Sequence, residues 1–369
     1  MRKTFFAQGA SLRRRHPFTV SITRRSFLVG SAAGVVAACG AASSSGGLTS
    51  SAAAPLRRSM AFANSGADPT LTLIAADGSV VEVAFGVQLD ETETTRPQGV
   101  PHAAAVSKGT IVPDGGGLRA ALEGRVALLE DGGLAFWDAR GSEARVFTGS
   151  AVSKAYEGRT IRECDAGAVL LSDGSVDTSL LERLTGQKPK GPLATAENAT
   201  LEGVRRLKGA VAFCDGGRFF TVSPRFAIPL KVREGDRVLD ASVVAGTRVQ
   251  LNFSHIYLAD GGAVVAPFGR TFKVFEGPPD AAQIEGGDLT VAIRTKGGAI
   301  WETNVVPDAL KLFRVNGIDQ AVDIATSVNH GIGAALRRDG TVWAWQLDDP
   351  EGRDKPVRVA EKIRVPEPA

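Results

Sequence analysis

The feature that most constrains this chain is a phrase that recurs from about residue 70 onward. Each copy has four or five apolar or small residues, two variable residues, a turn dipeptide that is usually Asp-Gly, and a second apolar stretch. Asp-Gly between two apolar runs is a strong β-hairpin signal, because a type I′ turn requires positive φ at both central residues. The seven copies centre on Asp77-Gly78, Asp131-Gly132, Asp173-Gly174, Asp215-Gly216, Asp260-Gly261, Lys296-Gly297 and Asp339-Gly340.

The spacing of these copies indicates the architecture. Four of the six intervals are 42 to 45 residues long, with extremes of 36 and 54; this period is typical of propeller blades and longer than the roughly 33 residues of short helical repeats. Runs before the turns, such as Leu71–Ala75 and Val126–Leu129, are too continuous for half-exposed strands and fit strands buried on both faces. With 43 Gly and two Met, the composition also favours many short strands. We therefore predict an all-β protein, a seven-bladed β-propeller over residues 70–369.

The last copy is the most complete. It reads Val322–Ala325 and then Gly333–Trp345, and it resembles the regulator-of-chromosome-condensation repeat, whose seven copies form a seven-bladed propeller. The second copy ends similarly in Phe136-Trp137, whereas the sixth has lost its turn Asp and carries Trp301 one residue late. The resemblance covers about residues 70–369 and implies one closed propeller.

The C-terminal tail suggests how the ring closes. Lys355–Ile363 is similar to the opening strand of an eighth unit, but no hairpin follows it. A closed ring leaves only short, protected strand edges. We expect this strand to complete the blade begun by the first copy, so that both ends of the propeller share one blade.

The first 38 residues predict export. Thr23–Leu28 resembles a twin-arginine signal, with Arg24 and Arg25 followed by Phe27 and Leu28. The mildly apolar run from 29 to 38 is far shorter than the ~20 residues that span a bilayer. Residues 1–38 are therefore interpreted as a signal peptide.

Cys39 follows a sequence that looks like a bacterial lipobox, Val36–Cys39, in which the cysteine is acylated. Several acyl chains on one residue hold a domain at a membrane, whereas one chain alone binds marginally. A cysteine beside an ordinary cleavage site is the alternative. Residues 39–69 are small and polar and predict a flexible linker. The expected location is outside the cytoplasmic membrane, anchored to it or to the outer membrane.

The distribution of charge argues against nucleic acid as a partner. The whole chain carries +3, but residues 1–38 hold seven cations and no Asp or Glu, which leaves 36 cations against 40 anions in the remainder. A domain without net positive charge lacks the electrostatic attraction that dominates non-specific phosphate binding.

The sequence contains no recognisable motif for catalysis, cofactor binding or metal binding, and we predict none of these sites. His102, His255 and His330 fall in different copies without metal-ligand spacing, and we expect His255 to be a packing or rim residue. Cys164 and Cys214 would lie about eight residues apart along adjacent blades, roughly 26 Å, and should be free thiols.

The four tryptophans could form a binding surface, but their place after the turns favours packing between blades. They are Trp137, Trp301, Trp343 and Trp345. On this reading they belong to the fold rather than to a site.

These features predict a non-catalytic, protein-binding propeller at the bacterial envelope, monomeric and with an unidentified protein partner; the argument for binding is analogy of fold. The alternatives are an envelope enzyme, a polysaccharide lyase or hydrolase, and a secreted inhibitor-like binder. The longest segment between copies is Gln88–Gly124. We predict a binding loop there, with candidate residues Glu91, Glu93, Arg96, His102 and Lys108.

Overall fold

The structure is a computed structural model, and it describes residues 58–63, 69–86, 89, 91–108, 125–137, 140–165, 168–184, 194–195, 201, 203–209, 211–222, 226–243, 255–268, 271–286, 290–304, 311–327, 331–347, 349–360 and 363–365. The predicted export and lipidation residues lie outside this part: Arg24, Arg25, Phe27, Leu28 and Cys39. None of the described helices has the length and apolar character needed to cross a membrane.

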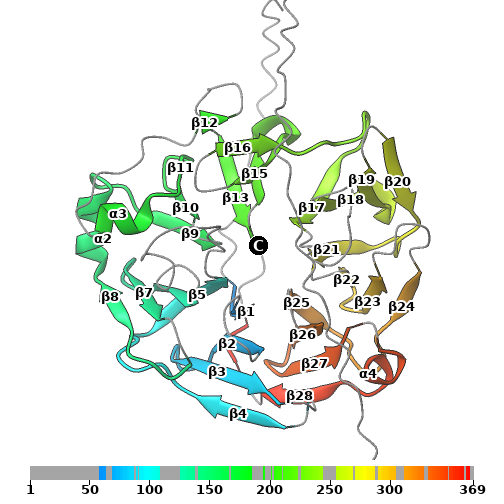
Figure 1. Ribbon diagram of the computed structural model, residues 1–369, viewed down its shortest axis with the longest axis horizontal. Helices are drawn as coiled ribbons and strands as arrows, with labels where there is room; N and C mark the ends of the chain where they lie inside the picture. Colours follow the sequence, from blue (N-terminus) through cyan, green and yellow to red (C-terminus); the bar gives the residue numbers. More distant parts are fainter. Residues whose placement is uncertain are drawn as a thin grey trace, which may run out of the picture. The chain divides into compact units, whose positions relative to one another are not determined.

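The described residues form a ring of seven sheets, so the predicted seven-bladed propeller is confirmed (Figure 1). We number the sheets as blades 1 to 7 in chain order. Blade 1 contains β1 (Met60–Phe62), β2 (Thr70–Ile74), β3 (Val80–Phe85) and β4 (Thr92–Thr95). Blade 2 contains β5 (Ala103–Lys108), β6 (Arg125–Leu129), β7 (Leu134–Trp137) and β8 (Arg145–Phe147). Blade 3 contains β9 (Ile161–Asp165), β10 (Ala168–Leu171) and β11 (Val176–Asp177).

Blades 4 to 7 complete the ring. Blade 4 contains β12 (Ala194–Thr195), β13 (Val204–Lys208), β14 (Val211–Cys214), β15 (Phe219–Val222) and β16 (Phe226–Pro229), and blade 5 contains β17 (Val238–Val243), β18 (His255–Ala259), β19 (Val264–Phe268) and β20 (Thr271–Phe275). Blade 6 contains β21 (Ala281–Gly286), β22 (Thr290–Thr295), β23 (Ile300–Asn304) and β24 (Leu312–Arg314), and blade 7 contains β25 (Ala321–Thr326), β26 (Ile332–Arg337), β27 (Val342–Gln346) and β28 (Val357–Ala360).

The inner strand of each blade lies near the centre of the ring and the later strands follow outward, except that β12, the first strand of blade 4 in the chain, lies at the outer edge (Figure 1). The predicted hairpins connect the second and third strands, but their turns are not type I′: the turn glycines have positive φ, as at Gly78 (85°) and Gly340 (82°), whereas the aspartates before them do not. The end of the ring that carries these hairpins is called here the turn rim, and the other end the opposite rim. The second strands β2, β6 and β10 are buried along their whole length, as the continuous apolar runs predicted.

Two blades depart from four strands. Blade 3 has three strands, and the helices α2 (Gly149–Ala155) and α3 (Leu180–Leu184) lie in the connections around them. Blade 4 has five, because the two-residue strand β12 pairs in parallel with the outer strand β16. A third helix, α4 (Pro350–Asp354), precedes β28, and the 3-10 turns η1 (Asp215–Gly217) and η2 (Asp260–Gly262) replace two of the hairpin turns.

The sixth hairpin differs from its prediction by one residue. Its turn residues are Gly297-Gly298 rather than Lys296-Gly297: Gly298 has φ 84°, and its N–H donates to Thr295 as that of Gly340 donates to Arg337. With this alignment Trp301 stands in register with Trp343 of the seventh copy, and it is not displaced. The loss of the turn Asp made the sequence alignment ambiguous by one position.

The predicted mechanism of ring closure is wrong. Strand β28 pairs with β27 in blade 7, and blade 1 obtains all four strands from residues 60–95. Its inner strand β1 lies within the predicted linker, so the propeller begins before residue 70. The three buried residues of β1 are too short a run to stand out beside the polar sequence that precedes them.

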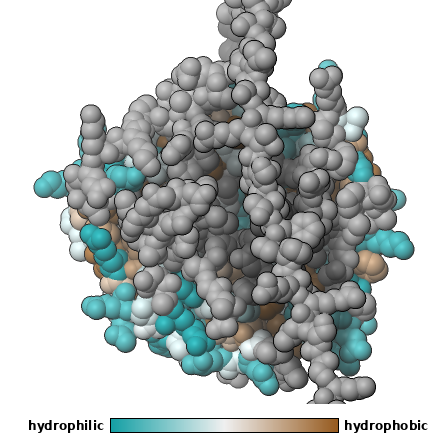
Figure 2. Space-filling model, in the orientation of Figure 1, coloured by the Kyte–Doolittle hydropathy of each residue, from teal (hydrophilic) through white to brown (hydrophobic). Residues whose placement is uncertain are grey.

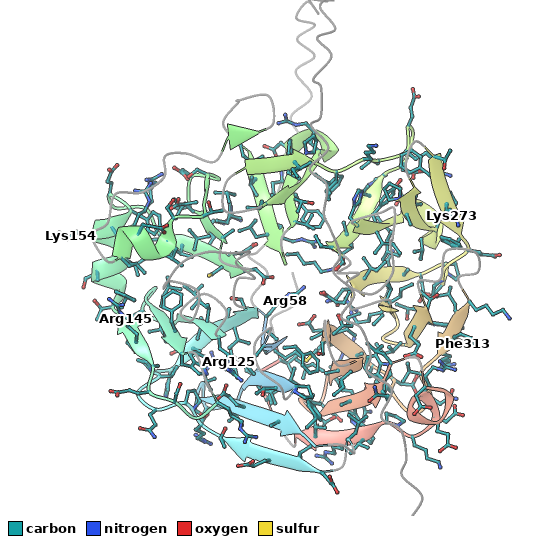
Figure 3. All side chains as sticks on the ribbon, in the orientation of Figure 1. Arg58, Arg125, Arg145, Lys154, Lys273 and Phe313 are labelled. Atoms are coloured by element: carbon teal, nitrogen blue, oxygen red, sulfur yellow. The ribbon has the colours of Figure 1, made fainter. Side chains whose placement is uncertain are left out.

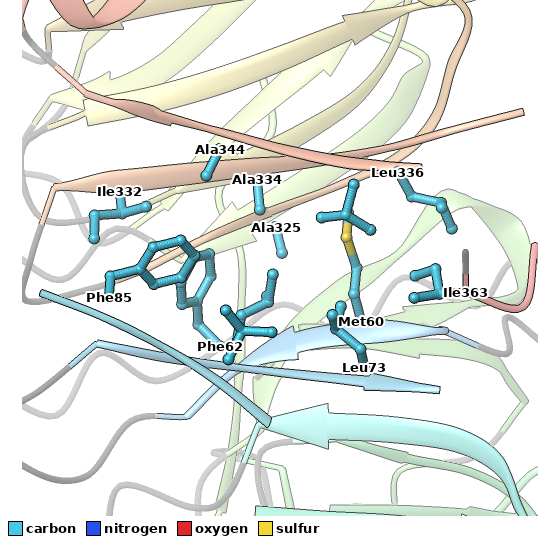
Figure 4. Close-up of a cluster of buried hydrophobic side chains, with 13 residues drawn as sticks. Met60, Phe62, Leu73, Phe85, Ala325, Ile332, Ala334, Leu336, Ala344 and Ile363 are labelled. Carbon is cyan, nitrogen blue, oxygen red and sulfur yellow. The ribbon is translucent and has the colours of Figure 1, made fainter. Parts of the chain in front are cut away.

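A segment after β28 joins the two ends instead. Ile363 forms a bridge with Ala75 and donates its N–H to Gly340 at 2.8 Å, and Arg364 donates its N–H to Ile74 at 2.7 Å. Ile363 is 6% exposed and packs in the core between blades 1 and 7, with Met60 and Leu336 among its neighbours (Figure 4). Blade 7 and blade 1 are thus held together by packing and by this C-terminal clip, residues 363–365.

Candidate functional site

Charged side chains gather where the inner strands surround the centre of the ring. Arg58, directly before β1, lies near the middle of the ring (Figure 3). It is 5% exposed, and Lys208, Asp240, Glu285 and Asp323 on four other inner strands are buried to a similar degree. We call the network around these five residues the polar hub.

Ion pairs in the hub connect blades that are not neighbours. Arg58 of blade 1 pairs with Glu285 of blade 6 at 2.5 Å, and Lys208 of blade 4 lies 3.5 Å from the same carboxylate. Lys208 also pairs with Asp240 of blade 5. Burial alone would lower the pKa of Arg58, but the charges of Glu285, Asp165 and Asp323 outweigh it and raise that pKa. Arg58 is therefore firmly cationic, with its charge matched inside the protein.

A second set of contacts joins neighbouring inner strands and recurs at two junctions, between blades 3 and 4 and between blades 5 and 6. Backbone N–H groups of one blade donate to side chains of the preceding blade: Leu207 to Glu163 and Gly209 to Asp165 at 2.6 Å, and Ile284 to Asp240 and Gly286 to Ser242 at 2.9 Å. Each pair spans 44 residues. Buried N–H groups left unpaired are costly, so these contacts fix how far one blade is offset from the next.

Asp323 is the hub carboxyl whose pKa is raised. Burial is the main cause, and Glu285 adds to it, while Arg58, Arg294 and a hydrogen bond from Gln283 act in the opposite direction. The carboxylate accepts from Gln283 at 2.7 Å and from the N–H of Ile324 at 2.9 Å.

We predict that Asp323 makes stability fall with rising pH. The folded state binds the proton of Asp323 more tightly than the unfolded chain, so its contribution is present below a pH of about 4 and is lost as the pH rises through the raised pKa. Asp323→Asn keeps the shape and removes the charge. Urea unfolding between pH 4 and 8 should show the free energy of unfolding of wild type falling relative to the variant; a constant or widening advantage would contradict the assignment.

The hub was not predicted, although a signal for it exists. Six inner strands contain a bulge, and the residue after it is polar in five: Glu163, Arg206, Asp240, Gln283 and Asp323. In the second blade the residue at this position is an alanine, Ala105. This recurring polar residue can be recognised in the sequence once the inner strands are aligned. Arg58 could not be recognised in the same way, because it lies in the segment that was predicted to be a linker.

Two tryptophans pack between blades as predicted. Trp137 of blade 2 donates its indole N–H to Glu82 of blade 1, and Trp345 of blade 7 donates to Glu302 of blade 6, both at 2.9 Å. Both carboxylates are at most 1% exposed. Each also pairs with a buried arginine, Arg125 and Arg353 respectively. These two clusters are equivalent in position and belong to the fold.

The structure also bears on the predictions for the two cysteines of the propeller and for His255. Cys164 and Cys214 are free, as expected. Burial raises the pKa of the Cys164 thiol to about 12 and that of Cys214 to about 11. His255 is buried at the start of β18, its Nε2 lies 3.0 Å from the carbonyl of Lys231, and burial lowers its pKa. His255 is thus a packing residue.

The residues of the predicted binding loop divide between the two rims. Arg96 and His102 follow β4 and lie at the turn rim, where Arg96 donates to Ser79 at 2.9 Å and both residues lower the pKa of Asp77, behind its hydrogen bonds from Ser79. Glu91 and Glu93 lie at the start of β4 toward the opposite rim, and Lys108 ends β5 on that side. The segment is largely blade structure where it is described, and it does not bring the five residues into one site.

Glu91 and Glu93 border a cavity of about 350 Å³ on blade 1. Arg140 from the loop after β7 pairs with Glu93 at 2.9 Å. The exposed periphery elsewhere is largely hydrophilic on the face that Figure 2 shows, with smaller apolar areas between the polar ones.

No family model and no curated protein matches this chain. The computationally designed Ika8 protein is similar over 79% of this chain and 84% of its own, with 15% identity and a TM-score of 0.41. Prp20p of Saccharomyces cerevisiae is similar over 71% and 65%, with 14% identity and a TM-score of 0.30. PorZ, a surface component of the type-IX secretion system of Porphyromonas gingivalis, is similar over 85% and 39%, with 9% identity and a TM-score of 0.33. The assignment of the propeller fold rests on the sheet topology.

Proposed function

We propose that this chain is an exported, lipid-anchored propeller that binds a protein partner at the bacterial envelope without catalysing a reaction. The observation that carries the proposal is the polar hub. Its buried charged side chains form ion pairs with one another or accept hydrogen bonds from protein groups, as Arg58 does with Glu285, Lys208 with Asp240, and Asp323 with Gln283 and Ile324. A centre committed to holding the ring leaves the two rims for recognition.

The export signal and lipobox supply the location. The linker predicted from composition between a lipid on Cys39 and a propeller that begins near Arg58 would let the domain stand away from the membrane. We expect a monomer, because a closed ring presents only short strand edges.

The anchor is tested by intact mass and membrane partition of wild type and Cys39→Ala in a bacterium with twin-arginine export. Acyl mass and membrane partition in wild type only would support the anchor. Unmodified, soluble protein in both cases would contradict it, and protein binding would then be sought for a freely secreted or cytoplasmic domain.

Protein binding is tested with a photo-crosslinking amino acid placed in intact cells at His102 on the turn rim or at Glu91 toward the opposite rim. A discrete protein adduct from one position and not the other would identify the recognition face. Buried Leu336 is the matched control and should give no adduct to another protein. If neither rim position gives an adduct, the protein-binding proposal is wrong, whatever the result for Cys39.

A further inference from the structure

The hairpin of blade 6 lacks two side chains that the hairpins of blades 1, 3 and 7 have; in blades 2, 4 and 5 the second of these positions is a glycine. In blade 7 the hydroxyl of Thr341 donates to Asp339 at 2.6 Å and accepts from the indole N–H of Trp343 at 3.3 Å. Ser79 and Ser175 bond in the same way to Asp77 and Asp173. In blade 6 the equivalent residues are Gly297 and Ala299, which have neither the carboxylate nor the hydroxyl.

The missing side chains border a cavity. It has a volume of about 530 Å³, and its lining includes Gly297, Ala299 and Trp301. The connection from blade 5, residues 276–280, forms one wall, and Leu312, Arg314 and Asp319 form another. Sites for small ligands usually measure about 300–1,000 Å³. The cavity thus has the size of a ligand site, on the turn rim and away from the hub.

Polar groups around the cavity are only partly satisfied by the protein. Asp280 Oδ2 lies 3.8 Å from where a Cβ on Gly297 would be, so the neighbouring connection brings a carboxylate near the position of the absent turn Asp. Arg314 and Asp319 pair with each other at 3.0 Å. Trp301 stands where Trp343 stands in blade 7, and within the described residues its indole N–H has no acceptor comparable to Thr341.

We propose that this cavity binds a neutral, hydroxyl-bearing ligand of the carbohydrate class. A ligand hydroxyl would take the place of the Thr341 hydroxyl, accepting from Trp301 and donating to Asp280. A hydroxyl can do both, whereas a carboxylate only accepts and a Lys or Arg side chain only donates. The apolar face of a sugar ring would lie against the Trp301 indole, which offers a large apolar surface beside a polar N–H. This site depends neither on the lipid anchor nor on protein binding.

The experiment is a titration of the ¹⁵N-labelled full chain with methyl β-glycosides of glucose, galactose, mannose and N-acetylglucosamine, into the high millimolar range. The chain has four tryptophans and therefore four indole N–H signals, assigned by Trp→Phe variants. The Trp301 signal should shift and saturate with at least one glycoside. The other three should remain, because Trp137, Trp343 and Trp345 already donate to protein oxygens.

Ala299→Thr is the decisive variant, because it restores the side chain that the repeat has in blade 7 and fills the site without opening a cavity. It should weaken glycoside binding at least tenfold, while the other indole signals report an intact fold. Trp343→Phe, which changes the blade 7 residue equivalent to Trp301, should leave binding unchanged. The proposal is overturned if no glycoside moves the Trp301 signal, if Ala299→Thr binds as wild type does, or if Nα-acetyl-lysine amide moves the signal and the glycosides do not.

Discussion

Replacing Glu82 by Leu should cost about 4 kcal/mol of unfolding free energy, because removal of one partner of a buried ion pair typically costs about 3–5 kcal/mol. Glu82 is fully buried between blades 1 and 2, where it pairs with Arg125 and accepts from Trp137. It also accepts from the N–H of Gly141 at 2.8 Å. The substitution leaves a buried guanidinium without this counter-charge and removes the acceptor from two N–H groups. Urea unfolding followed by tryptophan fluorescence measures the loss.

Glu93→Leu provides the matched control on the neighbouring strand, since Glu93 lies opposite Ala84 in the pairing of β3 with β4. Its side chain is 67% exposed and pairs with Arg140 at the surface. Exposed ion pairs contribute at most about 1 kcal/mol, so this variant should unfold almost as wild type does. Equal losses in Glu82→Leu and Glu93→Leu would show that the buried cluster does not join the blades as described.

The repeat itself could be predicted because its signal is local. Each Asp-Gly dipeptide marks a hairpin because its glycine adopts a positive φ that other residues rarely adopt. The buried second strands follow directly as apolar runs. A constant period then orders the hairpins into blades. The Trp137 and Trp345 positions were likewise readable, because they recur at a fixed place after the turn.

What could not be predicted depends on contacts between distant segments. Arg58 meets Glu285 across 227 residues, and no local pattern distinguishes that arginine from those of a polar linker. Strand β1 was missed for the same reason, because its three residues form a strand only by pairing with β2. Gly297 and Ala299 also look like ordinary turn residues in the sequence. Only the comparison with the hairpin of blade 7 shows that they replace a carboxylate and a hydroxyl group.

Strand β28 shows most clearly how a strand can be identified correctly and its partner wrongly. Residues 357–360 do form a strand, but the alternation of side chains that identifies a strand carries no information about which sheet edge it joins. The outer edge of blade 7 is the nearer partner along the chain, and β28 pairs there after the short turn of α4. The residues that follow β28, the C-terminal clip, then connect blade 7 to blade 1.

Ending the chain after Ala360 should therefore cost about 4 kcal/mol of unfolding free energy. Loss of a buried isoleucine side chain typically costs about 2–5 kcal/mol, and each backbone hydrogen bond about 1 kcal/mol. The truncation removes Ile363 from the core between blades 1 and 7, together with the N–H groups that donate to Gly340 and Ile74. It also removes Arg364, which donates to the carbonyl of Ala103 at 3.0 Å and pairs with Glu130.

Hydrogen exchange distinguishes this closure from a general loss of stability. Removal of residues 361–369 should speed exchange first at β1 and β2 of blade 1 and at β26 and β27 of blade 7, while blades 3 to 5 retain their protection, because opening spreads from the weakened seam. A chain ending at Val365 keeps the clip and should behave as wild type does. If both truncations exchange alike, or if exchange rises equally in all blades, the clip does not close the ring, and packing between blades 1 and 7 is sufficient.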